Sequence, residues 1–378
     1  MGRRVEVPIT PAVLAWAIAE SGYTEPEVSS WIDGGAATLK GWLDGKSRPS
    51  LAEMKNVAGR LHRQLATFLL PNAPEVESTP VKFRNSLADG TRALNPTERR
   101  YIRRAQRFQD AYSWLAAELG KDRIELPVFS LADDPVAAAT RVRTLLRVSV
   151  TRQREEWKTP SKAFDGWRDA LEGLGVLVFL FPMGTSSVRG FSLWDGQAPV
   201  VAINSAWKDE ARIFSMFHEL GHLVTRSSSA CAPATLMTGD SKDKAERWCE
   251  RFAAALLIPR KVLDEIGNVS DLTSLGNLAR KYKVSLSAMA LQLIHLNKAK
   301  WALFRVIPKA ADAKKPGGGG AGPPRTRRDI QEDQLGKRGS GIFVDAVKGE
   351  VIGPSEALDY LDIPSQALES MIAETRPQ

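Results

Sequence analysis

Residues 213–224 read Ile-Phe-Ser-Met-Phe-His-Glu-Leu-Gly-His-Leu-Val, which places His218 and His222 four residues apart and Glu219 between them. On a helix, residues four apart lie on one face with their Cβ atoms roughly 5–6 Å apart. Two imidazoles at this spacing can reach one Zn²⁺ at about 2.0–2.1 Å. Glu219 would then project toward the open coordination position, where a carboxylate can take a proton from water. The pattern predicts a helix that carries a catalytic metal site.

The surroundings of the motif favour a metal site over the alternative of two satisfied core histidines. Short strings of this form also arise by chance, so the pattern alone is not enough. The chain has only four histidines, and two of them make the motif. The neighbouring residues are uncharged, as expected for a metal-binding helix beneath a cleft: Phe217, Leu220, Gly221, Leu223 and Val224.

A catalytic zinc needs a third protein ligand and one open position. The next strong helical pattern runs over residues 243–258 and is followed by a proline. Glu246 and Glu250 lie one turn apart on it, beside its apolar stripe, and either could supply the carboxylate. The alternative for each glutamate is a solvated helix face on which it pairs with Arg247 or Arg251.

Two strings occur in order along the chain: His218-Glu-Leu-Gly-His222 and Glu246-Arg-Trp-Cys-Glu-Arg-Phe-Ala-Ala-Ala-Leu-Leu-Ile-Pro259. Together they resemble the ImmA/IrrE family of bacterial metallopeptidases, which carries HELGH and then a helix of the form E-x-x-[AC]-N-x-F-A-A-x-L-L-x-P. The resemblance spans residues 75–300 and implies Glu246 as the third zinc ligand. Glu250 stands where the family usually has Asn, so this chain has a second carboxylate one turn away.

The resemblance implies an α+β, zincin-like metallopeptidase domain with a small β-sheet. It also implies Zn²⁺ as cofactor, Glu219 as general base, and limited, site-specific cleavage of a protein target. That target would be a transcriptional repressor in stress-response or mobile-element regulation. From the residues themselves, β-branched and aromatic runs predict strands at 175–181, 188–193 and 199–203, ahead of the motif helix.

Residues 1–74 are expected to form a separate all-α helix-turn-helix domain, with short helices interrupted at glycine-containing turns. The pattern Trp42…Gly45…Arg48-Pro49…Leu51 resembles the Xre-type repressor domain. DNA is therefore a candidate partner, with Thr38, Lys40, Lys46 and Arg48 as the candidate contacts. However, residues 1–70 contain eight Lys/Arg against seven Asp/Glu, whereas a domain that binds phosphates normally has a clear basic excess. A docking or regulatory module is the alternative.

The stretch 96–119 predicts a long amphipathic helix with an arginine-rich exterior. Such a charge run usually marks a solvated helix face, and a groove for nucleic acid or an acidic peptide is the alternative. The arginines concerned are Arg99, Arg100, Arg103, Arg104 and Arg107.

The remaining boundaries and bulk properties follow from composition. We expect the metallopeptidase domain over 75–306, a flexible basic Gly/Pro linker over 307–330, and a small helical C-terminal segment over 331–378. No apolar run approaches 18 residues and the first residues show no apolar signal region, so we expect a cytoplasmic protein without a membrane partner.

Two other functions compete with the endopeptidase. The chain could act mainly as a DNA-binding transcriptional regulator, a hypothesis that rests on the helix-turn-helix pattern. It could also be a toxin-antitoxin-type interaction protein with a structural metal, because Glu250 as a fourth protein ligand would close the site.

Overall fold

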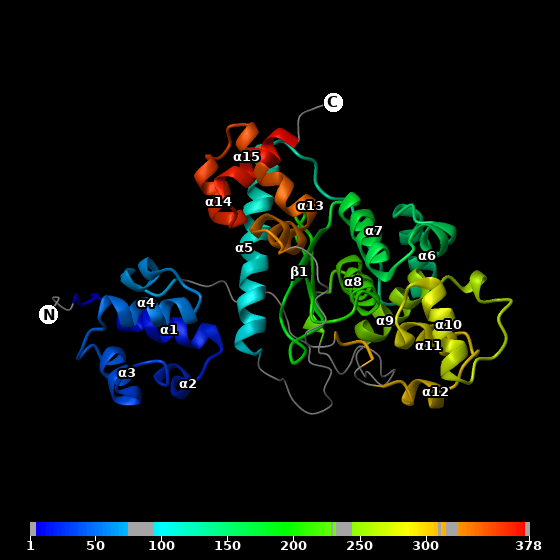
Figure 1. Cartoon of the computed structure of the whole chain (residues 1–378), viewed down its shortest axis with the longest axis horizontal. Coiled ribbons are helices and arrows are strands. Elements are labelled where there is room, and N and C mark those ends of the chain that lie inside the picture. The colour runs from blue at the N-terminus through cyan, green and yellow to red at the C-terminus, as the bar shows by residue number, and fades with distance from the viewer. Residues whose placement is uncertain are drawn as a thin grey trace. The chain divides into compact units, whose positions relative to one another are not determined.

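The described residues fall into two compact units (Figure 1). The computed structural model describes residues 5–74, 94–227, 230–231, 244–308, 311–314 and 324–374. Residues 5–74 and 94–104 belong to the first unit, and the described residues from 105 onward belong to the second. Residues 94–104 therefore belong to the N-terminal unit and not to the expected domain over 75–306.

The first unit is built from helices in the residues that the structure describes. Its interior is apolar, and Leu14, Trp42 and Met54 are each at most 1% exposed. Thr24 and Ser50 each begin a helix with a capping box. The elements are α1 (Pro11–Ser21), α2 (Glu25–Ser29), α3 (Gly35–Leu43), α4 (Leu51–Arg60), the 3₁₀ helix η1 (Leu65–Leu69) and the first turns of α5 (Pro96–Glu118).

The described residues of this region agree with the all-α expectation. α2 ends at Ser29, and α3 is then reached through two glycines with positive φ, Gly34 at 82° and Gly35 at 60°. Only glycine adopts such angles without steric cost. The resemblance to an Xre-type domain stays a prediction.

The second unit contains a small mixed sheet with the strand order β1-β3-β2-β4. β1 runs parallel to β3, and β2 is antiparallel to both of its neighbours. All residues of β1, β2 and β3 are buried, because both faces of the sheet are covered. The bounds are β1 (Leu177–Phe181), β2 (Gly190–Leu193), β3 (Val200–Asn204) and β4 (Ala230–Cys231), so the three strands predicted before the motif helix are confirmed.

Helices surround this sheet and position the motif. α8 contacts β2 and β3, α7 contacts α8 and β1, and α9 packs between α8 and α6. The helices are α6 (Pro135–Leu145), the π-helix η2 (Arg152–Glu156), α7 (Pro160–Gly173), α8 (Asp209–Val224), α9 (Lys244–Leu257), the 3₁₀ helix η3 (Arg260–Val262), α10 (Leu272–Tyr282), α11 (Leu286–His295) and α12 (Trp301–Arg305).

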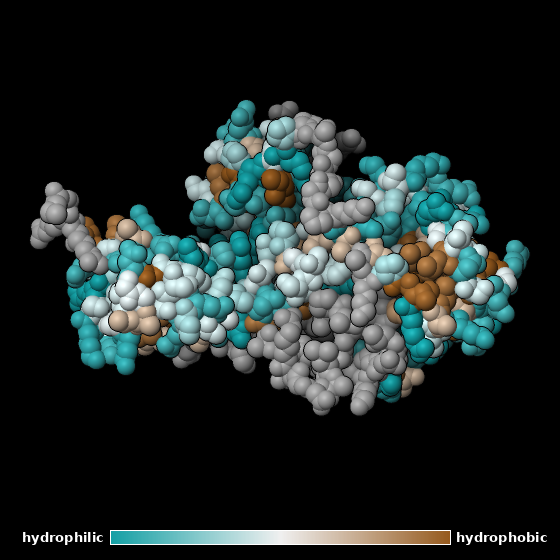
Figure 2. All heavy atoms as spheres, turned by 60° about the horizontal axis from the view of Figure 1, so that its bottom comes forward, coloured by the Kyte–Doolittle hydropathy of each residue, from teal (hydrophilic) through white to brown (hydrophobic). Residues whose placement is uncertain are grey.

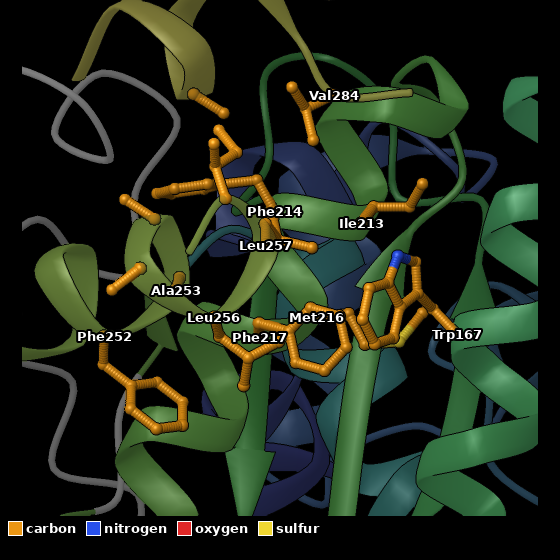
Figure 3. Packing of buried hydrophobic residues seen from close by; sticks show 14 of the residues in the cluster. Trp167, Ile213, Phe214, Met216, Phe217, Phe252, Ala253, Leu256, Leu257 and Val284 are labelled. Carbon is orange, nitrogen blue, oxygen red and sulfur yellow. The ribbon is translucent and has the colours of Figure 1, made fainter. Parts of the chain in front are cut away.

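Aromatic side chains fill the space between α7, α8 and α9 (Figure 3). The rings of Trp167 on α7 and Phe217 on α8 meet edge to face with their centroids 4.8 Å apart. Both residues are fully buried, and each such side chain stabilises the fold by roughly 1.5–3 kcal/mol. The face drawn in Figure 2 is mostly hydrophilic, with apolar surface confined to patches.

The C-terminal segment is helical and belongs to the second unit. α13 packs against β1, and a Cβ added to Gly339 would lie 3.2 Å from the Phe179 ring. A glycine at this position allows α13 to approach the sheet closely. α13 also begins inside the expected linker over 307–330, of which 309–310 and 315–323 lie outside the described residues. The helices are α13 (Arg327–Lys348), α14 (Pro354–Leu361) and α15 (Ser365–Glu374).

Among the described helices, none combines the length and the apolar character that a membrane crossing requires.

α8 and α9 approach each other closely at Gly221, where an added Cβ would lie 2.9 Å from Cys249 Sγ and 3.2 Å from its Cα. We expect Gly221→Ala to push α9 away and to lower the free energy of unfolding by roughly 1–3 kcal/mol, as overpacking does. Urea denaturation measures this loss. Gly173→Ala is the matched control, because nothing lies within 4 Å of its Cβ position. A Gly221→Ala variant as stable as Gly173→Ala would contradict this account of the α8–α9 contact.

Candidate metal centre

Three side chains from two helices converge in the second unit. His218 and His222 come from α8, and Glu246 comes from the first turn of α9. The Nε2 atoms of the two histidines are 3.2 Å apart. Glu246 Oε2 lies 3.1 Å from His218 Nε2, and its Oε1 lies 3.4 Å from His222 Nε2. Among the described residues, these three form a group whose ligand atoms could hold one metal ion.

The spacing of these atoms fits a tetrahedral ion. Ligands about 2.0–2.1 Å from a tetrahedral centre stand about 3.3–3.4 Å from one another. The observed separations of 3.1–3.4 Å are close to this value. Two imidazole nitrogens and one carboxylate are also a common donor set of catalytic zinc, and such a set leaves a fourth position open.

Burial and charge prepare Glu246 for this role. The two histidines are at most 1% exposed and Glu246 is 7% exposed. Burial by itself raises the pKa of the Glu246 carboxyl, but His222 and His218 outweigh that effect and hold the pKa well below its usual range. The carboxylate is therefore ionised at neutral pH, as a metal ligand must be.

Glu219 lies against a strand of the sheet. It is 1% exposed, and a Cβ added to Gly190 of β2 would lie 3.1 Å from its Cγ. A side chain at position 190 would press on the Glu219 side chain, so a glycine there gives it room. The sequence placed Gly190 in a strand but gave no signal of this contact.

Ser227 is a second residue that the sequence did not reveal. Its hydroxyl lies 3.0 Å from His222 Nδ1, on the side of the ring opposite Nε2, and 2.8 Å from Thr225 Oγ1. A partner at Nδ1 fixes the orientation and tautomer of a metal-binding imidazole. The chain reverses after α8, and the backbone N–H of Ser227 donates to the His222 carbonyl at 2.9 Å, which brings the hydroxyl into position.

Glu250 is buried near these ligands but is not part of the converging group. It is 2% exposed, and among the described residues its Oε1 has no hydrogen-bond partner. Burial, and then the charge of Glu246, raise the pKa of Glu250 to about 8. The side chain is therefore mostly neutral at pH 7, which disfavours it as a fourth ligand that would close the site.

The four candidate DNA contacts lie in the first unit, on α3 and just after it. Lys40 and Arg48 are exposed. Lys46 pairs with Asp44 at 2.8 Å, and Thr38 is half-buried with its side chain turned toward Gly34. This face therefore presents few unpaired cations, and its contact with DNA stays a prediction.

Comparison with known families gives one match. Residues 171–293 match the family model Peptidase_M78, described as the IrrE N-terminal-like domain. No curated protein matches the chain. The matched range covers about a third of the chain and includes β1 to β3, α8, α9 and all three converging side chains. The match supports the ImmA/IrrE resemblance for this part of the chain and, with it, a metal-dependent peptidase.

Removal of one ligand tests the metal centre. We expect purified protein to hold about one metal ion per chain. His222→Ala should lose most of it, because two remaining ligands hold an ion weakly. Elemental analysis of dialysed protein measures the content, with His62→Ala as the control because His62 is an exposed histidine of the first unit. Full metal retention in His222→Ala would refute the site.

The raised pKa of Glu250 predicts a pH-dependent effect on stability. The pKa of its carboxyl is about 8 in the folded chain, against an ordinary value of 4.5, so the folded chain binds this proton more tightly than the unfolded chain does. This contribution to stability is fully present below about pH 4.5 and is lost as the pH rises through about 8. Glu250→Gln, which is neutral at every pH, should therefore gain more stability over the parent at pH 8.5 than at pH 5. Thermal unfolding of chelator-treated protein measures the difference, and an equal gain at both values would argue against the raised pKa.

Proposed function

We propose that this chain is a zinc-dependent endopeptidase. The observation that carries the proposal is the convergence of His218, His222 and Glu246, with ligand atoms 3.1–3.4 Å apart beside the buried Glu219. Zinc is the metal that this donor set and geometry fit best. The match to Peptidase_M78 supports peptide-bond hydrolysis as the reaction.

Each nearby residue has a distinct role in the proposed reaction. Zinc bound by the three ligands would act as a Lewis acid toward the scissile carbonyl. Glu219 accepts the proton of the attacking water and later passes it to the leaving amine. Ser227 orients the ring of His222, and Gly190 leaves room for Glu219. Glu219 lies beside Gly190 of β2, so we propose that the scissile bond is held on this side of the sheet.

The proposed substrate is a protein that is cut at one or a few sites. The resemblance suggests a transcriptional repressor and a role in stress-response or mobile-element regulation. The site lies on a helix that is buried from Ala211 to Val224, so we propose that it takes a flexible, exposed linker of a folded target and not a folded surface.

Three isosteric variants separate the general base from the metal ligands. Glu219→Gln keeps its size but cannot accept a proton, so it should retain the metal while activity falls by roughly 10²–10⁴. Glu246→Gln should lose metal affinity, and Glu250→Gln should retain the metal because it lies outside the ligand group. Metal titration measures affinity, and mass spectrometry of a proteome-derived peptide library detects cleavage at any sequence that the library contains.

Two outcomes would count against the proposal. Metal loss in Glu250→Gln together with metal retention in Glu246→Gln would mean that the third ligand is misassigned. A metal-loaded parent protein that cleaves nothing in the library would instead favour a structural metal.

A further inference from the structure

Four arginines gather on the first unit, away from α3. Arg63 follows α4, and Arg99, Arg100 and Arg103 come from the first turns of α5. We refer to these four residues as the arginine cluster. Because residues 94–104 belong to this unit, the cluster joins segments that the expected boundary at residue 74 separates.

The surrounding chain holds these guanidinium groups without neutralising them. Arg103 Nη1 donates to the Glu20 carbonyl at 2.7 Å, and Arg99 Nε donates to the Leu94 carbonyl at 3.4 Å. Arg63 lies over the ring of Trp16 at 4.5 Å, and Arg100 lies over that of Tyr101 at 5.2 Å. Backbone carbonyls and ring faces carry no net charge. The positive charges are therefore not neutralised by these contacts, and Arg100 is exposed while Arg63, Arg99 and Arg103 are half-buried.

The charges of the cluster affect one another. Burial, and then the neighbouring charge of Arg63, lower the pKa of Arg103 to about 10, so it stays positively charged at neutral pH. Glu20 is the carboxylate that acts on Arg63 and Arg103, and its effect on the pKa of Arg103 is smaller than that of Arg63. Among the described residues, none of the four arginines is in an ion pair. Bringing like charges together is unfavourable, and an anionic partner would relieve that cost.

The observed unit is more basic than the sequence boundary suggested. Residues 1–70 carry eight Lys/Arg and seven Asp/Glu. Residues 71–80 add two glutamates, and residues 92–104 add five arginines and one glutamate, so the whole unit carries thirteen Lys/Arg and ten Asp/Glu. The basic excess of this unit therefore lies at the start of α5, whereas on the α3 side Lys46 is already paired with Asp44.

We propose that the arginine cluster binds the phosphate backbone of duplex DNA. Guanidinium groups match phosphate oxygens in shape and charge, and their contacts with the backbone do not depend on base sequence. Four such groups from two segments can meet a polyanion at several points. This surface differs from the α3 face that the Xre-type resemblance indicates, and it is independent of the metal centre.

The test uses the full chain and a fluorescently labelled duplex of arbitrary sequence, with anisotropy measured over a range of salt concentrations. The double variant Arg63→Gln, Arg100→Gln should bind more weakly and reduce the slope of log K against log salt by about 1.8, about 0.9 for each lost phosphate contact. Arg63→Lys, Arg100→Lys should keep most of the slope, because the charges remain. Lys261→Gln, Arg305→Gln removes two exposed cations of the second unit and should leave the slope unchanged.

Three results would overturn the proposal. The first is an unchanged slope in the double glutamine variant together with a lost slope in Lys40→Gln, Arg48→Gln, which would place DNA on the α3 face. The second is no salt-dependent binding of duplex by the parent chain, including the case in which an acidic polyglutamate peptide binds instead. The third is an equal loss of DNA affinity in the lysine and glutamine double variants. That result would show that binding depends on the packing of the arginines on Trp16 and Tyr101 and not on their charge. Circular dichroism confirms folding, and Arg100→Gln alone provides the measurement if the double variant unfolds.

Discussion

The close contact between α8 and α9 is the constraint on which the metal centre depends. Gly221 lies between His218 and His222 on α8, and its missing side chain lets α9 approach as far as Cys249. Cys249 is fully buried, and it lies one turn after Glu246. The short distance between α8 and α9 that packs Gly221 against Cys249 therefore also brings the Glu246 carboxylate within 3.1–3.4 Å of both imidazoles. A small residue inside the motif thus serves the geometry of the site as well as the packing of the core.

This packing also determines the charge state of the site. A buried carboxylate is unfavourable unless a cation or hydrogen-bond donors compensate it. Glu246 receives that compensation from His222 and His218, which hold its pKa low. Glu250, one turn away, meets no such partner in the part of the chain that the structure describes, and its pKa rises to about 8. Two glutamates on one helix thus become one anion and one mostly neutral acid. Only the first suits a cation, and this agrees with a three-ligand site that keeps a position open.

The sequence predicted the features that depend on residues close together in the chain, and it did not predict those that depend on packing between distant segments. The histidine spacing, Glu219 and the helix with Glu246 are set by contacts within a few turns, and these predictions agree with the geometry. Gly190 beside Glu219 depends on how β2 lies against α8, which no local pattern encodes. The same holds for residues 94–104, which share a helix with the second unit but pack in the first. A helical segment was expected over 331–378, but the start of α13 at Arg327 and its packing against β1 were not, because both depend on contacts with distant parts of the chain.

Glu250 stands where the family usually has Asn, and at neutral pH the two side chains are similar in charge and in hydrogen-bonding capacity. A protonated carboxyl group, like an amide, is neutral and offers both a donor and an acceptor. With its pKa at about 8, Glu250 is mostly in that form at pH 7. The resemblance and the geometry therefore agree on a neutral polar group beside the ligand Glu246. The difference emerges as the pH rises through 8, where an amide stays neutral and Glu250 becomes a second buried anion. A positive ion in the site would then offset the repulsion between the two carboxylates, so Glu250 ties metal occupancy to stability more strongly than an asparagine can.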